Sequence, residues 1–320
     1  MLLSMHDNYG KRAEGPSFEH WAFYRPLSRM LGENLIPFDF VAMTQEYGRA
    51  EVERMILATI DDRCPDALLV IPFNDATTPA LDFFGGIAKA RPWIKRWMWS
   101  CDSTWRYQTL DKPWSAVMDK IITTSAAARV WFTADHIIGK YAKSQWGANV
   151  VDFPNRTPFS GRGLDVAFVG GVHGGRKQYS DALAKSGLKV WIAGQGQPRG
   201  RASHEDMVAA YNNARVVLNF SSASQGPLSQ LKARIFEASA CGACVVTEHH
   251  PELAEYYKAD EVIQIPQCGP DALVDYLKTL LEQHEYVEGV ARRGYKRTMR
   301  DHVWEDRFKE LFLLLGGVHV

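Results

Sequence analysis

Residues 216–250 read VVLNFSSASQGPLSQLKARIFEASACGACVVTEHH, in which several structural signals follow one another. The pattern predicts a buried strand at 215–219, a helix at 228–240 after the Gly226-Pro227 break, and a second buried strand at 243–247. Two strands joined through a helix form a βαβ unit of a parallel sheet. Ligands bind at the carboxyl ends of such strands, so we expect Ser221 and Ser222, which follow the first strand, to face a crevice.

Arg234 and Glu237 lie three residues apart on the predicted helix, which places both side chains on one face. A guanidinium can bind a phosphate through two hydrogen bonds, and a carboxylate can accept hydrogen bonds from sugar hydroxyls. The same two residues could instead form an ion pair on the helix surface. From the residues alone, both interpretations stay open.

The pattern R-x-F-E-x-x-A-x-G spans residues 234–242, and a Val-Val strand follows it. It resembles the signature of the CgeB-like (spore-maturation-protein-like) group of GT-B glycosyltransferases. The resemblance implies two Rossmann-like α/β domains with parallel sheets, and a C-terminal helix that crosses back to the N-terminal domain. It also implies that Glu237 holds the donor ribose. In larger retaining relatives another glutamate lies eight positions earlier, where this chain has Ser229.

Length and composition narrow the class of protein. A chain of 320 residues suits two α/β domains of about 150 residues each. Its 37 basic and 37 acidic residues balance, so no overall field favours nucleic acid as a partner. The five scattered cysteines are typical of reduced thiols in a cytoplasmic protein. No apolar run is long enough to span a bilayer, although contact with a membrane surface stays open. The sequence does not indicate an oligomeric state.

The N-terminal half alternates apolar strands with helices, which predicts a parallel sheet covered by helices. The strands are expected at 2–5, 35–41, 66–73, 95–100, 120–124 and 149–153, and the helices at 18–31, 50–61, 126–132 and 134–145. His6 and Asp7 directly follow the first strand, where a side chain can act as a general base. The alternative is that these polar residues simply form a turn.

Asp102 follows the strand at 95–100 and has Trp99, Trp105 and Tyr107 around it in the sequence. Aromatic rings bind sugars, and a carboxylate beside them can orient or deprotonate an acceptor hydroxyl. We therefore predict Asp102 as the catalytic residue, with His6 and Asp7 in reserve. The alternative is a cap on the next helix, with the tryptophans in the core. Basic residues between these aromatics would also suit single-stranded nucleic acid, but the balanced charge argues against it.

Residues 154–163 are rich in Pro, Gly and Arg and are the predicted linker between the two halves. The expected domains are an N-terminal acceptor domain at 1–155, a donor domain at 156–302, and a terminal helix at 303–320. The terminal helix carries an apolar stripe. The resemblance to GT-B proteins implies that this stripe packs on the N-terminal domain.

A glycine-rich loop follows the predicted strand at 164–169. It contains Gly170, Gly171, His173 and two further glycines, and Arg176 and Lys177 come directly after it. Backbone amides in such a loop can approach a phosphate closely at the start of a helix, and the two cations add charge. The spacing is neither that of a P-loop nor that of a dinucleotide fingerprint.

The resemblance, together with these patterns, implies a glycosyltransferase of hexosyltransferase type, which moves a sugar from a nucleotide-diphosphate donor to a hydroxyl acceptor. The predicted donor contacts are Gly170, Gly171, His173, Arg176, Lys177, Ser221, Ser222, Arg234 and Glu237. No closely spaced Asp-x-Asp pair offers a metal site, so we expect metal-independent chemistry with the nucleotide sugar as co-substrate and no cofactor. The alternative is a non-catalytic nucleotide- or glycan-binding protein of the same fold. A Rossmann dehydrogenase or epimerase would need a fingerprint that is absent.

Overall fold

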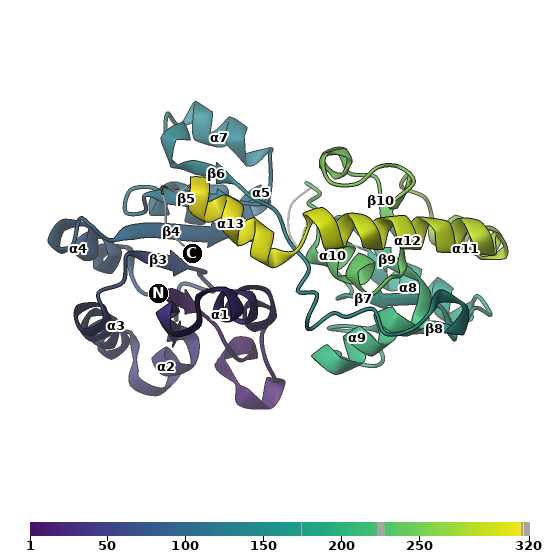
Figure 1. The fold of residues 1–320 in the computed structure, drawn as a ribbon, viewed down its shortest axis with the longest axis horizontal. Coiled ribbons are helices and arrows are strands. Elements are labelled where there is room, and N and C mark those ends of the chain that lie inside the picture. Colours follow the sequence, from purple (N-terminus) through teal and green to yellow (C-terminus); the bar gives the residue numbers. More distant parts are fainter. Residues whose placement is uncertain (174, 223–227, 315, 317–320) are drawn as a thin grey trace. The chain divides into compact units, whose positions relative to one another are not determined.

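The structure is a computed structural model that describes residues 1–173, 175–222, 228–314 and 316. The chain forms two compact units: unit 1 comprises Met1–Gln145 and Trp304–Val320, and unit 2 comprises Trp146–Val303. Each unit has one sheet of parallel strands with helices packed on it (Figure 1). The predicted α/β class with two Rossmann-like sheets is therefore confirmed. Among the described residues, no helix is both long and apolar enough to cross a membrane.

The sheet of unit 1 contains six strands in the order β2-β1-β3-β4-β5-β6. Their bounds are β1 (Leu2–Ser4), β2 (Pro37–Asp39), β3 (Ala67–Val70), β4 (Lys95–Ser100), β5 (Lys120–Thr123) and β6 (Tyr141–Lys143). The second strand lies on one side of β1 and all later strands lie on the other, so the strand order reverses between β1 and β3. In open parallel sheets, such a reversal places a ligand crevice at the carboxyl ends of the two strands.

Helical segments cover this sheet. They are η1 (Asn8–Gly10), η2 (Arg12–Glu14), η3 (His20–Tyr24), α1 (Arg25–Leu31), η4 (Gly32–Asn34), α2 (Phe40–Tyr47), α3 (Arg49–Arg63), α4 (Leu81–Ala90), α5 (Ser103–Arg106), η5 (Tyr107–Asp111), α6 (Lys112–Trp114), α7 (Ala128–Ala134), η6 (Ile138–Lys140) and α13 (Trp304–Leu314). The strand predicted to reach residue 41 ends at Asp39, because the Asp39 carboxylate accepts hydrogen bonds from the amides of Val41 and Ala42 and so starts α2.

The terminal helix α13 belongs to unit 1, as the resemblance to GT-B proteins implies. The ring centroid of Trp304 lies 5.0 Å from that of Phe23 and 5.6 Å from that of Trp99. Arg29 adds an ion pair to Glu305 at 2.7 Å. Burial of each large aromatic side chain stabilises the contact by about 1.5 to 3 kcal/mol, which far exceeds the contribution of the partly exposed ion pair.

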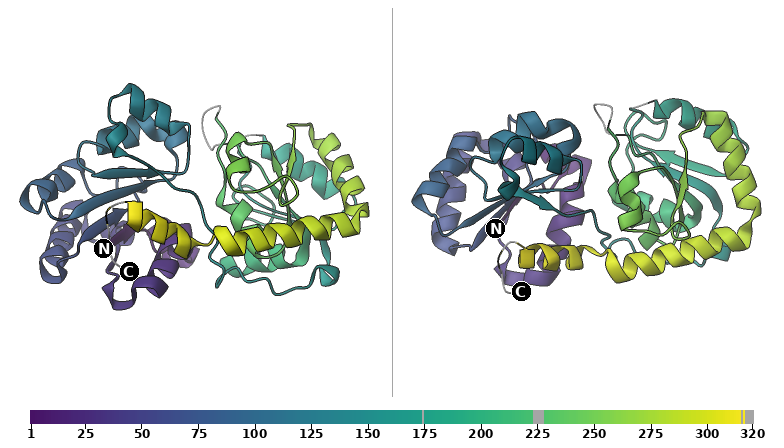
Figure 2. Two further views of the ribbon diagram at one scale, coloured as in Figure 1. Left: turned by 45° about the horizontal axis from the view of Figure 1, so that its top comes forward. Right: turned by 90° about the horizontal axis from the view of Figure 1, so that it is seen from above.

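The sheet of unit 2 has five parallel strands in the order β11-β10-β9-β7-β8, with helices around it (Figure 2). The strands are β7 (Leu164–Val169), β8 (Val190–Ala193), β9 (Ala214–Asn219), β10 (Cys244–Glu248) and β11 (Ile263–Ile265). The helical segments are η7 (Phe159–Gly161), α8 (Arg176–Lys185), α9 (His204–Asn213), α10 (Ala233–Ala240), η8 (Pro251–Glu255), α11 (Pro270–Glu282) and α12 (His284–Asp301). Here the strand order reverses between β7 and β9.

The structure corrects two predictions before the linker. Residues 134–145 do not form one helix, because β6 pairs there with β5 and completes the sheet edge. Residues 149–153 form a turn and not a strand. The Asn149 side chain donates to the Asp152 carboxylate at 2.6 Å and accepts from the Asp152 amide, which favours a turn over an extended chain.

A third correction concerns the stretch between the two strands of the βαβ unit. The helix predicted from residue 228 begins only at Ala233, because Ser229 pairs with Ser222 in an antiparallel bridge and keeps the preceding residues extended. The predicted break at Gly226 and Pro227 lies outside the described residues, as does Gly174 of the glycine loop.

Candidate functional site

The glycine loop leaves β7 at the strand reversal of unit 2 and is held by the neighbouring loop. The amide of Gly170 donates to Ala193 O at 2.8 Å, and the amide of Val172 donates to Gln195 O at 3.1 Å. Gly194 has φ +141, and a Cβ there would lie 2.2 Å from Gly170 O. Only glycine therefore permits this approach, which fixes the path of the loop.

The Arg234 guanidinium lies beside the glycine loop. Its Nη1 donates to Asn219 Oδ1 at 2.9 Å, and its central carbon lies 5.2 Å from the centroid of the Phe168 ring. A side chain at Gly170 would come within 2.9 Å of Arg234 Nη2. Arg234 Nε is buried, and none of the described residues accepts a hydrogen bond from it. The guanidinium is thus fixed in place while part of its donor capacity stays unused.

Glu237 lies one turn further along α10 and is only 9% exposed. Burial raises its pKa to about 7, against the opposing effect of Arg234. Within the described part of the chain, the Glu237 carboxylate accepts no hydrogen bond and has no ion-pair partner within 4 Å, and only the more distant charge of Arg234 acts on it. Arg234 and Glu237 therefore do not form a surface ion pair, and the buried carboxylate can accept hydrogen bonds from a ligand.

Arg176 has a different environment from Arg234. It is buried, and its Nη2 donates to Phe220 O at 3.2 Å, to Ser222 O at 2.8 Å and to Ser222 Oγ at 3.0 Å. Burial, together with the nearby Arg234, lowers the pKa of Arg176 to about 10, so the side chain stays charged at neutral pH. Arg176 joins the first turn of α8 to the loop after β9 and supplies positive charge between them.

The other predicted donor residues differ in exposure and in their contacts. Lys177 points to the surface of α8 and pairs with Asp181 at 2.7 Å. Ser221 is buried, and its amide donates to Glu248 Oε2 at 2.7 Å. His173 is exposed, and its pKa is lowered first by desolvation and then by the positive charges of Arg176, Lys232 and Arg234. The structure thus gathers three cations near His173, which favours an anionic ligand.

Two residues of this site were not predicted from the sequence. Asn219 orients Arg234, and Phe168 supports it with the face of its ring. Asn219 carries a signal, because a polar residue that ends a buried strand is expected to be satisfied by a specific partner. Phe168 has no such signal in the sequence, since it resembles any other apolar residue of a buried strand.

At the carboxyl edge of unit 1, His6 and Asp7 follow β1 at the strand reversal. The His6 amide donates to Asp39 Oδ2 at 3.2 Å, and the His6 ring lies 5.0 Å from that of Tyr24. Desolvation lowers the pKa of His6, with Asp39 and Asp7 acting in the opposite direction. The imidazole is therefore neutral at physiological pH, which is the form that can accept a proton.

Asp102 follows β4, two strands away from β1 in the same sheet. Its side chain makes no capping hydrogen bond to α5. The predicted aromatic surface around it is wrong for two residues, because Trp99 packs in the core against Phe23 and the Tyr107 hydroxyl donates to Asp135 at 2.7 Å. Both rings are buried and cannot stack on a sugar.

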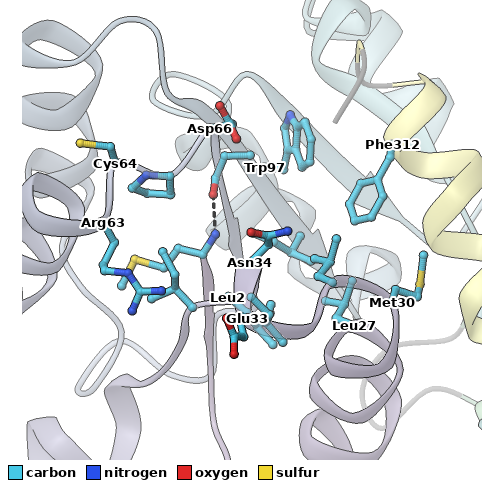
Figure 3. Close-up of a pocket in the computed structure, with 17 residues that line it drawn as sticks. Leu2, Leu27, Met30, Glu33, Asn34, Arg63, Cys64, Asp66, Trp97 and Phe312 are labelled. Carbon is cyan, nitrogen blue, oxygen red and sulfur yellow. Dashed lines mark hydrogen bonds between the residues drawn. The ribbon is translucent and has the colours of Figure 1, made fainter. Parts of the chain in front are cut away.

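A cavity of about 430 Å³ in unit 1 lies elsewhere, at the amino ends of the strands (Figure 3). It is lined mainly by apolar side chains such as Leu27, Met30, Trp97 and Phe312, and beside it the Met1 ammonium donates to Ala67 O at 2.7 Å. The opposite edge of the sheet carries His6, Asp7 and Asp102, so this cavity is not the predicted crevice. In the residues that the structure describes, no three His, Cys, Asp or Glu side chains gather as a metal site.

Comparison with known proteins gives a family match for the C-terminal segment and solved structures of similar fold for the whole chain. Residues 176–312 match the model of the glycosyl transferase-like family. No curated protein matches the chain in sequence. Among solved structures, HepE from Anabaena in complex with UDP and glucose has a TM-score of 0.67 at 12% identity, over 98% of this chain and 98% of that one. A glycosyltransferase from Rickettsia africae ESF-5 has a TM-score of 0.60 at 11% identity, over 98% and 97%.

Sucrose-phosphate synthase from Thermosynechococcus elongatus is also similar, with a TM-score of 0.58 at 13% identity over 88% of this chain and 79% of that one. The chain therefore has the GT-B fold, and the match to the glycosyl transferase-like family runs from the start of α8 into α13. These findings confirm the predicted fold, and the family match over residues 176–312 agrees with the predicted class of enzyme. They do not show that the chain belongs to the CgeB-like group.

Proposed function

We propose that this protein transfers a sugar from a nucleotide-diphosphate donor to a hydroxyl acceptor, and that the donor binds at the carboxyl edge of unit 2. The observation that carries the proposal is the Arg234 guanidinium, fixed by Asn219 and Phe168 beside Gly170 at the strand reversal. A fixed cation beside a glycine-rich loop at the start of a helix suits a diphosphate. In support, HepE, of similar fold, is described in complex with UDP and glucose.

In this proposal the donor site divides into two parts. Arg234 holds the diphosphate against the close backbone of Gly170 and Gly171, with the charge of Arg176 behind them. Glu237 accepts hydrogen bonds from the ribose. When the sugar leaves, negative charge grows on the diphosphate, and these preorganised donors stabilise it. The reaction would then need no metal and no cofactor besides the nucleotide sugar.

The acceptor side is proposed at the carboxyl edge of unit 1. Of the three candidates, His6 and Asp7 lie at the strand reversal, whereas Asp102 lies two strands away. A neutral imidazole can take the proton of the attacking hydroxyl, so we assign the base to His6, with Asp7 and Asp102 as alternatives. We also propose membership of the CgeB-like group, on the pattern of residues 234–242, and a cytoplasmic location.

The test is incubation of the purified protein with a panel of nucleotide sugars and hydroxyl acceptors, followed by detection of released nucleoside diphosphate and glycosylated product. Turnover with one donor, lost in His6→Ala, is the expected result. A non-catalytic binding protein of the same fold is the second candidate, because Ser229 stands where larger relatives have a glutamate. Tight nucleotide binding without turnover on any acceptor would favour that candidate.

A further inference from the structure

Unit 2 contains a second cavity, of about 370 Å³, at the amino edge of its sheet. The segment 155–162, which precedes β7, forms one wall, and α12 forms another, with Gly242 just before β10. Because all strands of this sheet are parallel, the cavity lies at the opposite edge from Arg234 and the glycine loop. Its volume falls in the range of about 300 to 1,000 Å³ that is usual for small-molecule sites.

The lining of this cavity is positively charged. It includes Arg156, Arg162 and Arg292, while Glu288 is its one acidic residue among those described. Arg156 and Arg292 are exposed, and no described carboxylate lies within ion-pair distance of either guanidinium. Two guanidinium groups are therefore available to a ligand that enters the cavity.

Arg162 adds a third positive charge that is almost completely buried, at 3% exposure. All its hydrogen bonds go to neutral oxygens, which belong to Asn155, Thr157, Tyr211, Ala214 and Cys241. Its Nε has no partner among the described residues. A buried cation without a counter-ion is costly, so an anion in the adjoining cavity would be stabilised by it.

The backbone keeps this arrangement in place. Gly242 has φ +72, and a Cβ there would lie 2.4 Å from Asn155 Nδ2 and 3.1 Å from Arg162 Nη2. On α12, Ala291, Arg292 and Tyr295 are spaced so that they share one face, and the small Ala291 leaves room between the longer side chains. The half-buried Tyr295 hydroxyl offers a further donor.

We propose that this cavity binds the phosphate group of a small anionic molecule through Arg156 and Arg292, with Arg162 as a buried positive charge behind it. Guanidinium groups pair with phosphate oxygens through two parallel hydrogen bonds, which explains the choice of anion. The cavity is larger than a phosphate ion and leaves space for a small organic group. The phosphate source is thus either free inorganic phosphate or a phosphate monoester.

The experiment is a calorimetric titration of the full chain with inorganic phosphate and, separately, with glycerol phosphate, both at constant ionic strength. We expect saturable binding of at least one of them, weakened roughly tenfold or more in Arg292→Gln and in Arg156→Gln. Lys296→Gln is the matched control, since Lys296 is exposed on the same helix but does not line the cavity. Its affinity should equal that of the unmodified chain.

A further variant, Arg234→Gln, separates this cavity from the proposed donor site. Phosphate binding that persists in Arg234→Gln and is weakened in Arg292→Gln supports the proposal, whichever of the two probes binds. Binding that is lost in Arg234→Gln and retained in Arg292→Gln would place the anion at the donor site and overturn the proposal. Absence of saturable binding for both probes would overturn it as well.

Discussion

The carboxyl edges of the two sheets differ in chemistry although their topologies are alike. Both sheets are parallel, and both reverse their strand order beside their first strand. In unit 2 the reversal carries glycines and the buried or fixed cations Arg176 and Arg234, whereas in unit 1 it carries His6 and Asp7. A cationic, glycine-rich edge suits a diphosphate, and an imidazole beside a carboxylate suits a hydroxyl. On the proposed function, the loops and helix starts that follow the strands, and not the sheets themselves, distinguish the donor side from the acceptor side.

The largest expected effect lies on the unit 1 side of this comparison. His6→Ala should lower turnover about 100 to 10,000-fold, because a general base contributes in that range, while donor affinity stays unchanged. Steady-state rates and a separate donor titration check both parts. Asp102→Asn is the comparison variant and should have the smaller effect. If Asp102→Asn loses activity and His6→Ala retains it, the base lies after β4 and the argument from strand reversal fails.

On the unit 2 side, Glu237→Ala should weaken binding of the nucleotide by about 1.5 to 3 kcal/mol, as expected for hydrogen bonds to a charged group. Binding of inorganic pyrophosphate should stay unchanged, because it lacks the ribose. Titration calorimetry with both ligands tests this difference. Equal losses for both ligands would mean that Glu237 acts on the diphosphate or on the fold, and not on the ribose.

The pKa of Glu237 predicts a pH dependence of stability. Burial raises it from 4.5 to about 7, so the folded state keeps a proton that the unfolded chain releases. The contribution of Glu237 to stability should therefore be largest below about pH 4.5 and fall as the pH rises to 7, by at most ~1.4 kcal/mol per pH unit. Glu237→Gln stays neutral and should lack this contribution. Urea denaturation of both proteins between pH 5 and 7 measures this contribution. If the free energy of unfolding changes with pH equally in both proteins, the raised pKa of Glu237 is contradicted.

Asn219 should give the smallest effect at the donor edge. Asn219→Ala removes the Arg234 contact at 2.9 Å but leaves the Phe168 ring beneath the guanidinium. We expect nucleoside diphosphate affinity to fall by about 1 kcal/mol, typical of one hydrogen bond. Asn219→Asp retains an acceptor and should restore part of the affinity. No difference between these two variants would show that Asn219 does not position Arg234.

The sequence predicts most strands of both sheets, because buried parallel strands form continuous apolar runs that end in polar residues. It fails at 134–145, where the partner strand β5 and not the local pattern determines the structure. At the donor site, spacing alone identifies Arg234 and Glu237 as neighbours but cannot decide between ligand binding and a surface ion pair. Burial of Glu237 rules out the surface ion pair, and this burial depends on residues such as Tyr211 that lie far away in the sequence.

The roles of cations are equally hard to predict. Arg176 and Lys177 are adjacent and both follow the glycine loop, so the sequence assigns them the same function. In the structure, Arg176 turns inward to Ser222 and Lys177 turns outward to Asp181. Which of two successive residues faces the sheet depends on where the helix starts, and a shift of one residue would turn Lys177 inward in place of Arg176.

The most direct test of the donor site compares Arg234 with Lys177, two cations near the same loop. The measurement is calorimetric titration of a nucleoside diphosphate, UDP first, into the unmodified chain, Arg234→Ala and Lys177→Ala. We predict a loss of roughly 10 to 100-fold in affinity for Arg234→Ala. Lys177→Ala should change affinity by less than about threefold, because its exposed ion pair contributes little. Unchanged affinity in Arg234→Ala, with binding intact in the unmodified chain, would contradict the donor site at the carboxyl edge of unit 2.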